Sequence, residues 1–153
     1  MLSRRTATRL TLAALAVVAA AITGCGVMNK QSSLVAFTTQ LRGANEVPAN
    51  ASPGSGSVDA VFDPSTNLFR WKVNYTRLTG PATAGHFHGP AAIGANAGVA
   101  LGWASPLKSP MDGSATLTAA QAADLMAGRW YANIHTAAYP AGEVRGQMTV
   151  VRN

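Results

Sequence analysis

The chain has 153 residues, of which 12 are Lys or Arg and 6 are Asp or Glu, and it contains a single cysteine. The basic residues are scattered and form no run that could follow a phosphate backbone, so binding to nucleic acid is not expected. One cysteine cannot form a disulfide within the chain, so a folded domain must be held together by its core alone.

The first 24 residues have the pattern of an export signal. Arg4, Arg5 and Arg9 form a basic start, and residues 10–22 form an apolar run that is too short for an ordinary membrane span of about 20 residues. The run leads into residues 22–25 (ITGC), which resemble the bacterial lipobox. In that type of signal the cysteine is lipidated on its sulfur and becomes the first mature residue.

This resemblance predicts a signal peptide over residues 1–24 and a lipidated Cys25 with a short tether over residues 25–33. The lipid would attach the protein to a bacterial membrane, on its periplasmic or extracellular side. Gly26 follows the cysteine in place of the aspartate associated with inner-membrane retention in some enteric bacteria, so the outer membrane is favoured if the host has one. Residues 34–153 are about the length of one domain.

The first part of this domain shows the two-residue periodicity of strands. Apolar and polar residues alternate over residues 35–41 and again over residues 57–62. The clearest pattern lies in residues 69–76, where one face carries Phe69, Trp71, Val73 and Tyr75. Residues 63–67 (DPSTN) have turn chemistry, so the second and third segments should form a hairpin with one face in the core.

Shorter segments follow. Residues 86–88 predict a short strand that ends at Gly89-Pro90 and has Phe87 as its inward residue. Residues 98–103 predict a further strand, residues 104–113 a loop, and residues 114–117 one more short strand.

The only segment that favours a helix is residues 119–127. Thr118 and Gln121 have the spacing of a capping box, and Gly128 is a typical C-terminal stop. Two strands should follow, over residues 129–135 and 142–151. Seven to eight short strands and one short helix (about residues 118–127) predict an all-β fold, an antiparallel Greek-key sandwich or barrel.

All three histidines fall in two short segments, which makes them the leading candidate site. A His-x-His pair on a strand, here His86 and His88, places both imidazoles on the face opposite Phe87. His135 should lie opposite Ile134, so all three are expected on outer sheet faces near loops. Together they could hold copper or zinc, with an affinity that falls as the pH drops toward ~6. Alternatively, each histidine only forms a hydrogen bond with a loop backbone.

The strand face beside His135 carries further polar candidates. Glu143 could orient an imidazole or act as a fourth ligand. Alternatively, Glu143 has a structural role and forms an ion pair with Arg145, while Gln147 fixes the loops by hydrogen bonding. Asn133 shares the face of His135 and is interpreted as a residue that fixes a loop by hydrogen bonding.

Other residues have mainly structural interpretations. Glu46 is a possible partner of Arg145. Met111 or Met148 could add sulfur to a copper site, but the position of Met148 in its strand places it in the core. The remaining candidates are aromatic residues that could line a pocket but are more often found in the core: Tyr131 and Trp103.

No catalytic motif stands out, so an enzyme is not favoured. There is no Gly-x-Ser-x-Gly elbow and no glycine loop of the phosphate-binding kind. Glu46 and Glu143 could form a carboxylate pair for glycoside hydrolysis, but the sequence does not give the distance between them.

Four segments together resemble the CHRD domain, named after its occurrence in chordin and also found in bacterial exported proteins. The segments are residues 41–48 (LRGANEVP), 85–90 (GHFHGP), 125–131, and 133–136 (NIHT) running into 142–147 (GEVRGQ). The resemblance covers residues 34–151 and implies an extracytoplasmic β domain without an established reaction. The growth-factor binding of chordin does not transfer to a bacterial lipoprotein.

A looser similarity connects the His-x-His strand to copper/zinc superoxide dismutase. The chain lacks the disulfide, the zinc subsite and the number of histidines of that family, so dismutase activity is not carried over. The leading interpretation is therefore a lipid-anchored binding module that holds copper or zinc through His86, His88 and His135. The alternatives are a metal-free adhesion or protein-interaction module and, less favoured, a copper redox enzyme.

Overall fold

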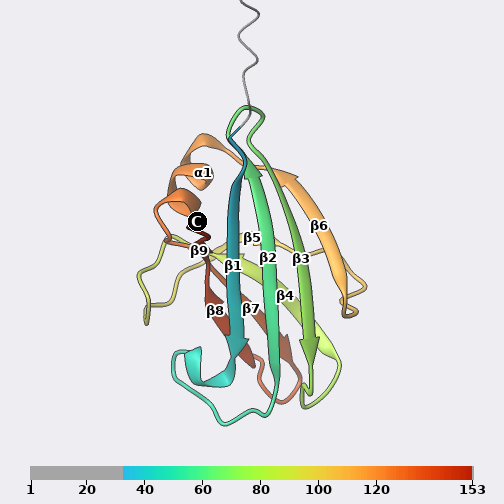
Figure 1. Cartoon of the computed structure of the whole chain (residues 1–153). Coiled ribbons are helices and arrows are strands. Elements are labelled where there is room, and N and C mark those ends of the chain that lie inside the picture. Colours follow the sequence, from blue (N-terminus) through green and yellow to red (C-terminus); the bar gives the residue numbers. More distant parts are fainter. Residues whose placement is uncertain (1–32, 153) are drawn as a thin grey trace, which may run out of the picture. The chain divides into compact units, whose positions relative to one another are not determined.

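The computed structural model describes residues 33–152 (Figure 1). The predicted signal peptide, Cys25 and nearly all of the predicted tether lie outside the described residues. Within the described part, the polypeptide forms an antiparallel β domain with one short α-helix, as the sequence predicts.

Four strands form one half of the sheet, in the order β1-β2-β3-β6. Their bounds are Val35–Arg42 (β1), Ser55–Asp63 (β2), Leu68–Thr76 (β3) and Met111–Thr116 (β6). A 3-10 turn, η1 (Gly43–Asn45), follows β1. The predicted hairpin is confirmed, because β2 and β3 pair along their whole length from Ser55↔Thr76 to Asp63↔Leu68.

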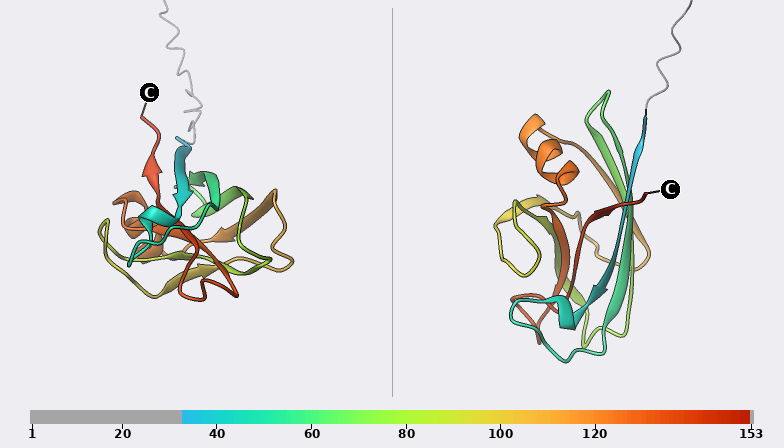
Figure 2. Two further views of the ribbon diagram at one scale, coloured as in Figure 1. Left: turned by 90° about the horizontal axis from the view of Figure 1, so that it is seen from below. Right: turned by 60° about the vertical axis from the view of Figure 1, so that its left-hand side comes forward.

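The other half of the sheet has the order β5-β4-β7-β8. Its strands are Ala82–His88 (β4), Val99–Gly102 (β5), Tyr131–Thr136 (β7) and Val144–Gln147 (β8). The predicted strand over residues 142–151 is divided at Met148, after which β9 (Thr149–Val150) pairs with β1. Because β8 pairs with both β7 and β1, and β9 also pairs with β1, the C-terminal segment joins the halves into one curled sheet. Figure 2 shows the two halves as facing layers.

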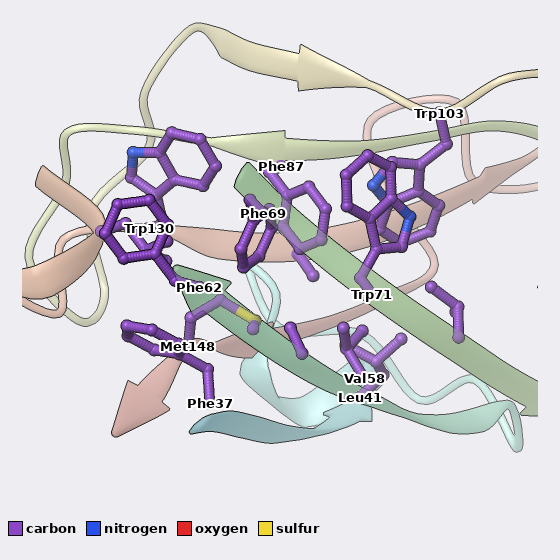
Figure 3. Close-up of a cluster of buried hydrophobic side chains, with 14 of the residues drawn as sticks. Phe37, Leu41, Val58, Phe62, Phe69, Trp71, Phe87, Trp103, Trp130 and Met148 are labelled. Atoms are coloured by element: carbon purple, nitrogen blue, oxygen red, sulfur yellow. The ribbon is translucent and has the colours of Figure 1, made fainter. Parts of the chain in front are cut away.

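The core lies between these layers and is rich in aromatic side chains (Figure 3). Phe69, fully buried on β3, contacts rings from both halves at centroid distances of 5.3–6.4 Å. Its ring neighbours are Phe37, Trp71, Phe87 and Trp130. The alternation in the sequence therefore predicts the inward residues of β1, β2 and β3 correctly, since burial of these apolar groups stabilises the layered arrangement.

The helix α1 (Ala119–Met126) begins where the sequence predicts and ends one residue earlier than predicted. The Gln121 backbone N–H donates to Thr118 Oγ1 at 3.2 Å, and the Thr118 backbone N–H donates to Gln121 Oε1 at 2.9 Å, which completes the capping box. Gly128 has a positive φ of 69° after the last turn, a conformation that favours glycine.

Two predicted boundaries are wrong. The strand predicted over residues 86–88 is only the end of β4, which begins at Ala82. Residues 111–113, which the sequence places in a loop, belong to β6 and pair with β3 in the register Trp71↔Gly113 and Val73↔Met111. The glycine and the preceding prolines suggest a loop, but the indole of Trp71 lies where a side chain at position 113 would have to be. Gly113 is therefore needed for a cross-strand contact and does not mark a turn.

Candidate metal centre

The histidines are brought together by the pairing of β4 with β7. Phe87 is fully buried on the inner face, so His86 and His88 project from the outer face of β4. In the antiparallel register His86 faces Asn133, and Ala84 faces His135. His135 is therefore two residues along β7 from Asn133, on the same face, which makes the imidazoles of His86 and His135 diagonal neighbours. The prediction that all three histidines occupy an outer face is confirmed.

The ring nitrogens lie close enough to share one ion. Nδ1 of His86 is 3.2 Å from Nε2 of His135, and one nitrogen from each of the three rings lies within 4.8 Å of the others. Two imidazoles on one tetrahedral Zn²⁺, with bonds of about 2.0–2.1 Å, have nitrogens about 3.3 Å apart. Among residues 33–152 this is the only group of three or more His, Cys, Asp or Glu side chains with such spacing.

Backbone carbonyls set the tautomers of two rings. His88 Nδ1 donates to the Ala97 carbonyl and His135 Nδ1 donates to the Pro140 carbonyl, both at 3.0 Å. Each ring therefore keeps a lone pair on Nε2, as a metal ligand requires. Nε2 of His88 is buried and has no hydrogen-bond partner, which is an unfavourable state that a bound cation would relieve.

Electrostatics favour the neutral forms of His86 and His135. Burial lowers the pKa of His86 below its usual value, and the neighbouring His135 and His88 lower it further. Burial also lowers the pKa of His135, with a contribution from His88, although the hydrogen bond to Pro140 acts in the opposite direction. Neutral imidazoles bind copper or zinc, so these shifts favour binding.

A stack of side chains holds His88 in place. The ring of Tyr131 lies parallel to that of His88, with 4.8 Å between centroids and 3° between planes. On the other side of Tyr131, from β8, the Arg145 guanidinium lies 3.4 Å from the ring centroid. The Tyr131 hydroxyl also contacts the backbone of Ala97, the residue that accepts the His88 hydrogen bond.

The loop between β4 and β5, residues 89–98, covers this region. Arg145 donates to Asn96 Oδ1 at 2.8 Å and to the Ala95 carbonyl at 2.6 Å. Gln147 donates to the carbonyls of Ala91 and Gly128, so its predicted role in fixing loops is confirmed. The outer face of β4, β7 and β8 is called the covered face below.

Glu143 lies away from the imidazoles and serves a different set of loops. Its fully buried carboxylate accepts hydrogen bonds from the hydroxyls of Ser52, Thr79 and Thr136 and from the Thr79 backbone N–H. Burial raises the pKa of Glu143, but these hydrogen bonds outweigh burial and hold it below its usual value. None of these hydrogen bonds involves an imidazole. The carbonyls of Ala97 and Pro140, and not Glu143, accept the hydrogen bonds that orient His88 and His135.

Two further predictions about polar neighbours are wrong. The predicted ion pair of Arg145 with Glu46 or Glu143 is absent from the described part of the chain, where Arg145 is instead bonded to residues 95 and 96. Burial raises the pKa of Glu46 to about 7, and the charge of Arg145 opposes this only in part. Asn133, expected to fix a loop, is buried with its Oδ1 unpartnered.

The remaining candidates belong to the core. Met148 is fully buried there, as predicted, and Met111 packs partly buried against the same cluster. Trp103 packs on Phe87 with 5.2 Å between ring centroids. Sequence reasoning missed the importance of Tyr131 as the stacking partner of His88, and the spacing of residues 131 and 135 on one strand face was the only available signal.

Comparison with known proteins supports the resemblance found in the sequence. The family model described as the CHRD domain matches residues 37–148, which is most of the chain. The comparisons with curated proteins and with solved structures found no match. Across residues 33–152, no helix has the length and apolar character needed to cross a membrane. The matched region includes all the strands that carry the three histidines, and the chain therefore belongs to the CHRD domain family.

Proposed function

We propose that this protein is a lipid-anchored extracytoplasmic module that binds one copper or zinc ion through His86, His88 and His135. CHRD membership suggests an extracellular binding module. The observation that carries the metal assignment is the spacing of the three imidazoles, with 3.2 Å between two candidate ligand nitrogens. The buried and unpartnered Nε2 of His88 supports the same conclusion.

The ligand set would be completed by one proton transfer. In the metal-free cluster Nδ1–H of His86 donates to the lone pair on Nε2 of His135. Moving that proton to Nε2 of His86 leaves a lone pair on Nδ1, so all three rings can then bind through nitrogen. Three imidazoles leave the fourth position of a tetrahedral ion open to water or to an outside ligand.

The proposal is tested by titrating the purified full chain with Zn²⁺ and Cu²⁺ and measuring heat and metal content. Cys25 should be lipidated or replaced by serine, so that a free thiol does not compete for the metal. We expect one ion per chain, and an affinity about a hundredfold or more lower in His86→Ala and His135→Ala, since loss of a supporting contact alone costs 10–100-fold. Lys72→Ala, on the opposite half of the sheet, serves as the matched control and should bind normally.

The pH dependence gives a second readout. Because the pKa values of His86 and His135 are lowered, protons should compete with the metal at these two rings only below the usual imidazole value of about 6.5. Absence of binding, or binding that survives both histidine substitutions, would contradict the metal assignment. The histidines would then be structural, and the metal-free interaction module would be the better description.

The membrane anchor is a separate proposal based on residues 22–25. In a bacterial host, we expect a fatty-acid analogue to label the wild-type protein and the protein to fractionate with membranes. Cys25→Ser should abolish labelling and release the protein, whereas Ser32→Ala, in the predicted tether, should do neither. Labelling that persists in Cys25→Ser would overturn this assignment without affecting the metal site.

A further inference from the structure

The outer face of β1, β2, β3 and β6 is called the open face below, because its charged residues Asp59, Arg70 and Lys72 are exposed. One row of side chains across it is internally compensated. Thr38 Oγ1 donates to Asp59 at 2.8 Å, and Lys72 Nζ lies 4.0 Å from Asp112, with Asp59 directly opposite Lys72 in the register. The charges of this row therefore have partners within the sheet.

The next two rows, toward the C-terminal end of β1, are different. The register aligns Gln40 with Ser57 and Asn74, and Arg42 with Ser55 and Thr76. These six residues, together with Arg77, line a surface hollow of about 400 Å³. Ser55, Ser57 and Asn74 are half-buried, and the two arginines are exposed at its rim.

The polar side chains of this hollow are unpaired within the described part of the chain. Among residues 33–152, none of the seven side chains makes a side-chain hydrogen bond or an ion pair. No acidic residue lines the hollow, so the charges of Arg42 and Arg77 are uncompensated there. Two guanidinium groups beside neutral hydroxyls and amides form a set of donors without a bound acceptor.

The backbone at Arg77 is a second, independent observation. Its φ of 56° lies in the left-handed region, which is costly for a residue other than glycine. Such conformations cluster at binding and active sites, where the structure holds a side chain in a required position. Here the left-handed turn directly follows β3 and places residue 77 at the rim of the hollow.

We propose that this hollow binds an acidic saccharide, with Arg42 and Arg77 contacting its carboxylate and the serines and amides contacting its hydroxyl groups. A simple inorganic anion would need only the two arginines and would leave the five neutral polar side chains unused. A hollow of about 400 Å³ lies within the range of about 300–1,000 Å³ that is typical of small-ligand sites. This inference is independent of the metal proposal, because the two sites lie on different halves of the sheet.

The test is calorimetric titration of the full chain with an oligogalacturonate, using Cys25→Ser protein throughout so that no attached lipid can insert into vesicles. A maltooligosaccharide of the same length, inorganic phosphate and vesicles containing anionic lipid are the comparison ligands. The double variant Arg42→Gln/Arg77→Gln removes both cations. The matched control, Arg70→Gln/Lys108→Gln, removes the same charge at exposed positions outside the hollow.

We expect the oligogalacturonate to bind the wild-type chain and the control about equally, and the Arg42/Arg77 variant about tenfold or more weakly. A further variant, Ser57→Ala/Asn74→Ala, keeps both charges and should weaken saccharide binding without changing phosphate binding. The assignment would be overturned if the wild-type chain did not bind the oligogalacturonate, or if the control variant lost as much affinity as the Arg42/Arg77 variant. It would also be overturned if the maltooligosaccharide, phosphate or anionic vesicles bound as tightly as the oligogalacturonate. Circular dichroism of each variant verifies that the sheet is retained.

Discussion

The outer faces of the two halves of the sheet have similar sequence patterns but different environments. On the open face, Asp59 and Lys72 alternate with core residues and are exposed to solvent. On the covered face, Tyr131, Asn133 and Arg145 alternate with core residues in the same way, yet each is at most 3% exposed. Polar alternation therefore predicts the direction of a side chain, but the loops decide whether that side chain meets water.

The difference has energetic consequences. Burying polar groups is unfavourable unless they are hydrogen-bonded, so a covered polar face needs a dense set of partners. Its residues Arg145 and Gln147 have them, each donating two hydrogen bonds. The exceptions are His88 Nε2 and Asn133 Oδ1. Both belong to or adjoin the histidine cluster, which is where an external ligand would supply the missing partner.

The largest effect should come from removing the buried carboxylate. Glu143→Ala leaves the hydroxyls of Ser52, Thr79 and Thr136 without their acceptor, so we expect the free energy of unfolding to fall by about 3–4 kcal/mol. Asp59→Ala removes a carboxylate from the open face and should change it by no more than about 0.5 kcal/mol. Urea unfolding of both variants measures the contrast, and similar values for the two would contradict it.

The second effect depends on pH. Because the pKa of Glu46 is raised to about 7, the folded state holds a proton that the unfolded state loses near pH 4.5. The stability that this bound proton contributes is therefore fully present below about pH 4.5 and is lost as the pH rises through about 7. Glu46→Gln should be about neutral at pH 4 and stabilising by about 2–3 kcal/mol at pH 8. Urea unfolding across this range provides the measurement, and a difference that does not change with pH would refute the burial argument.

The third effect concerns Arg145, which is buried under the loop formed by residues 89–98. Arg145→Gln loses contacts with Asn96, the Ala95 carbonyl and the ring of Tyr131, so we expect a loss of about 2 kcal/mol in the free energy of unfolding. Metal affinity should also fall by about tenfold, because the stack that orients His88 is loosened. Arg70→Gln is the matched substitution on the open face and should change neither quantity. If the two arginine substitutions changed stability and metal affinity equally, the contacts of Arg145 with the loop over residues 89–98 would have no special role.

The smallest effect should be seen at the exposed ion pair. Lys72 and Asp112 are 4.0 Å apart, with side chains that are 55% and 74% exposed. Lys72→Ala should therefore change the free energy of unfolding by no more than about 0.5 kcal/mol, and less in high salt. A loss above 1 kcal/mol in thermal or urea unfolding would show that the open face is more tightly coupled than its geometry indicates.

The sequence predicts the strands and the inward residues well because those properties are local. The two-residue alternation over β1 to β3 determines which side chains face the core, and the Thr118–Gln121 spacing determines the start of the helix. The proximity of His135 to His86 could be proposed from shared strand faces. Its distance could not, because the β4–β7 register depends on the whole sheet.

The parts that could not be predicted involve backbone groups and loops. The carbonyls of Ala97 and Pro140 orient two imidazoles, and neither residue type carries a side-chain signal for that role. Glu143 and Arg145 look like an ion pair in the sequence, yet each is bonded to partners from a distant loop. Burial of a polar side chain by a loop far away in the chain is a tertiary effect that local patterns do not encode.

The most direct test of the metal assignment is a crystal structure of the full chain grown with Zn²⁺ or Cu²⁺, with anomalous scattering recorded at the absorption edge of the metal. We expect one anomalous peak on the covered face, about 2.0–2.1 Å from a nitrogen of each of His86, His88 and His135. We also expect His88 and His135 to keep their Nδ1 hydrogen bonds to Ala97 and Pro140. A structure with no peak between these rings, or with the metal held elsewhere, would refute the metal assignment.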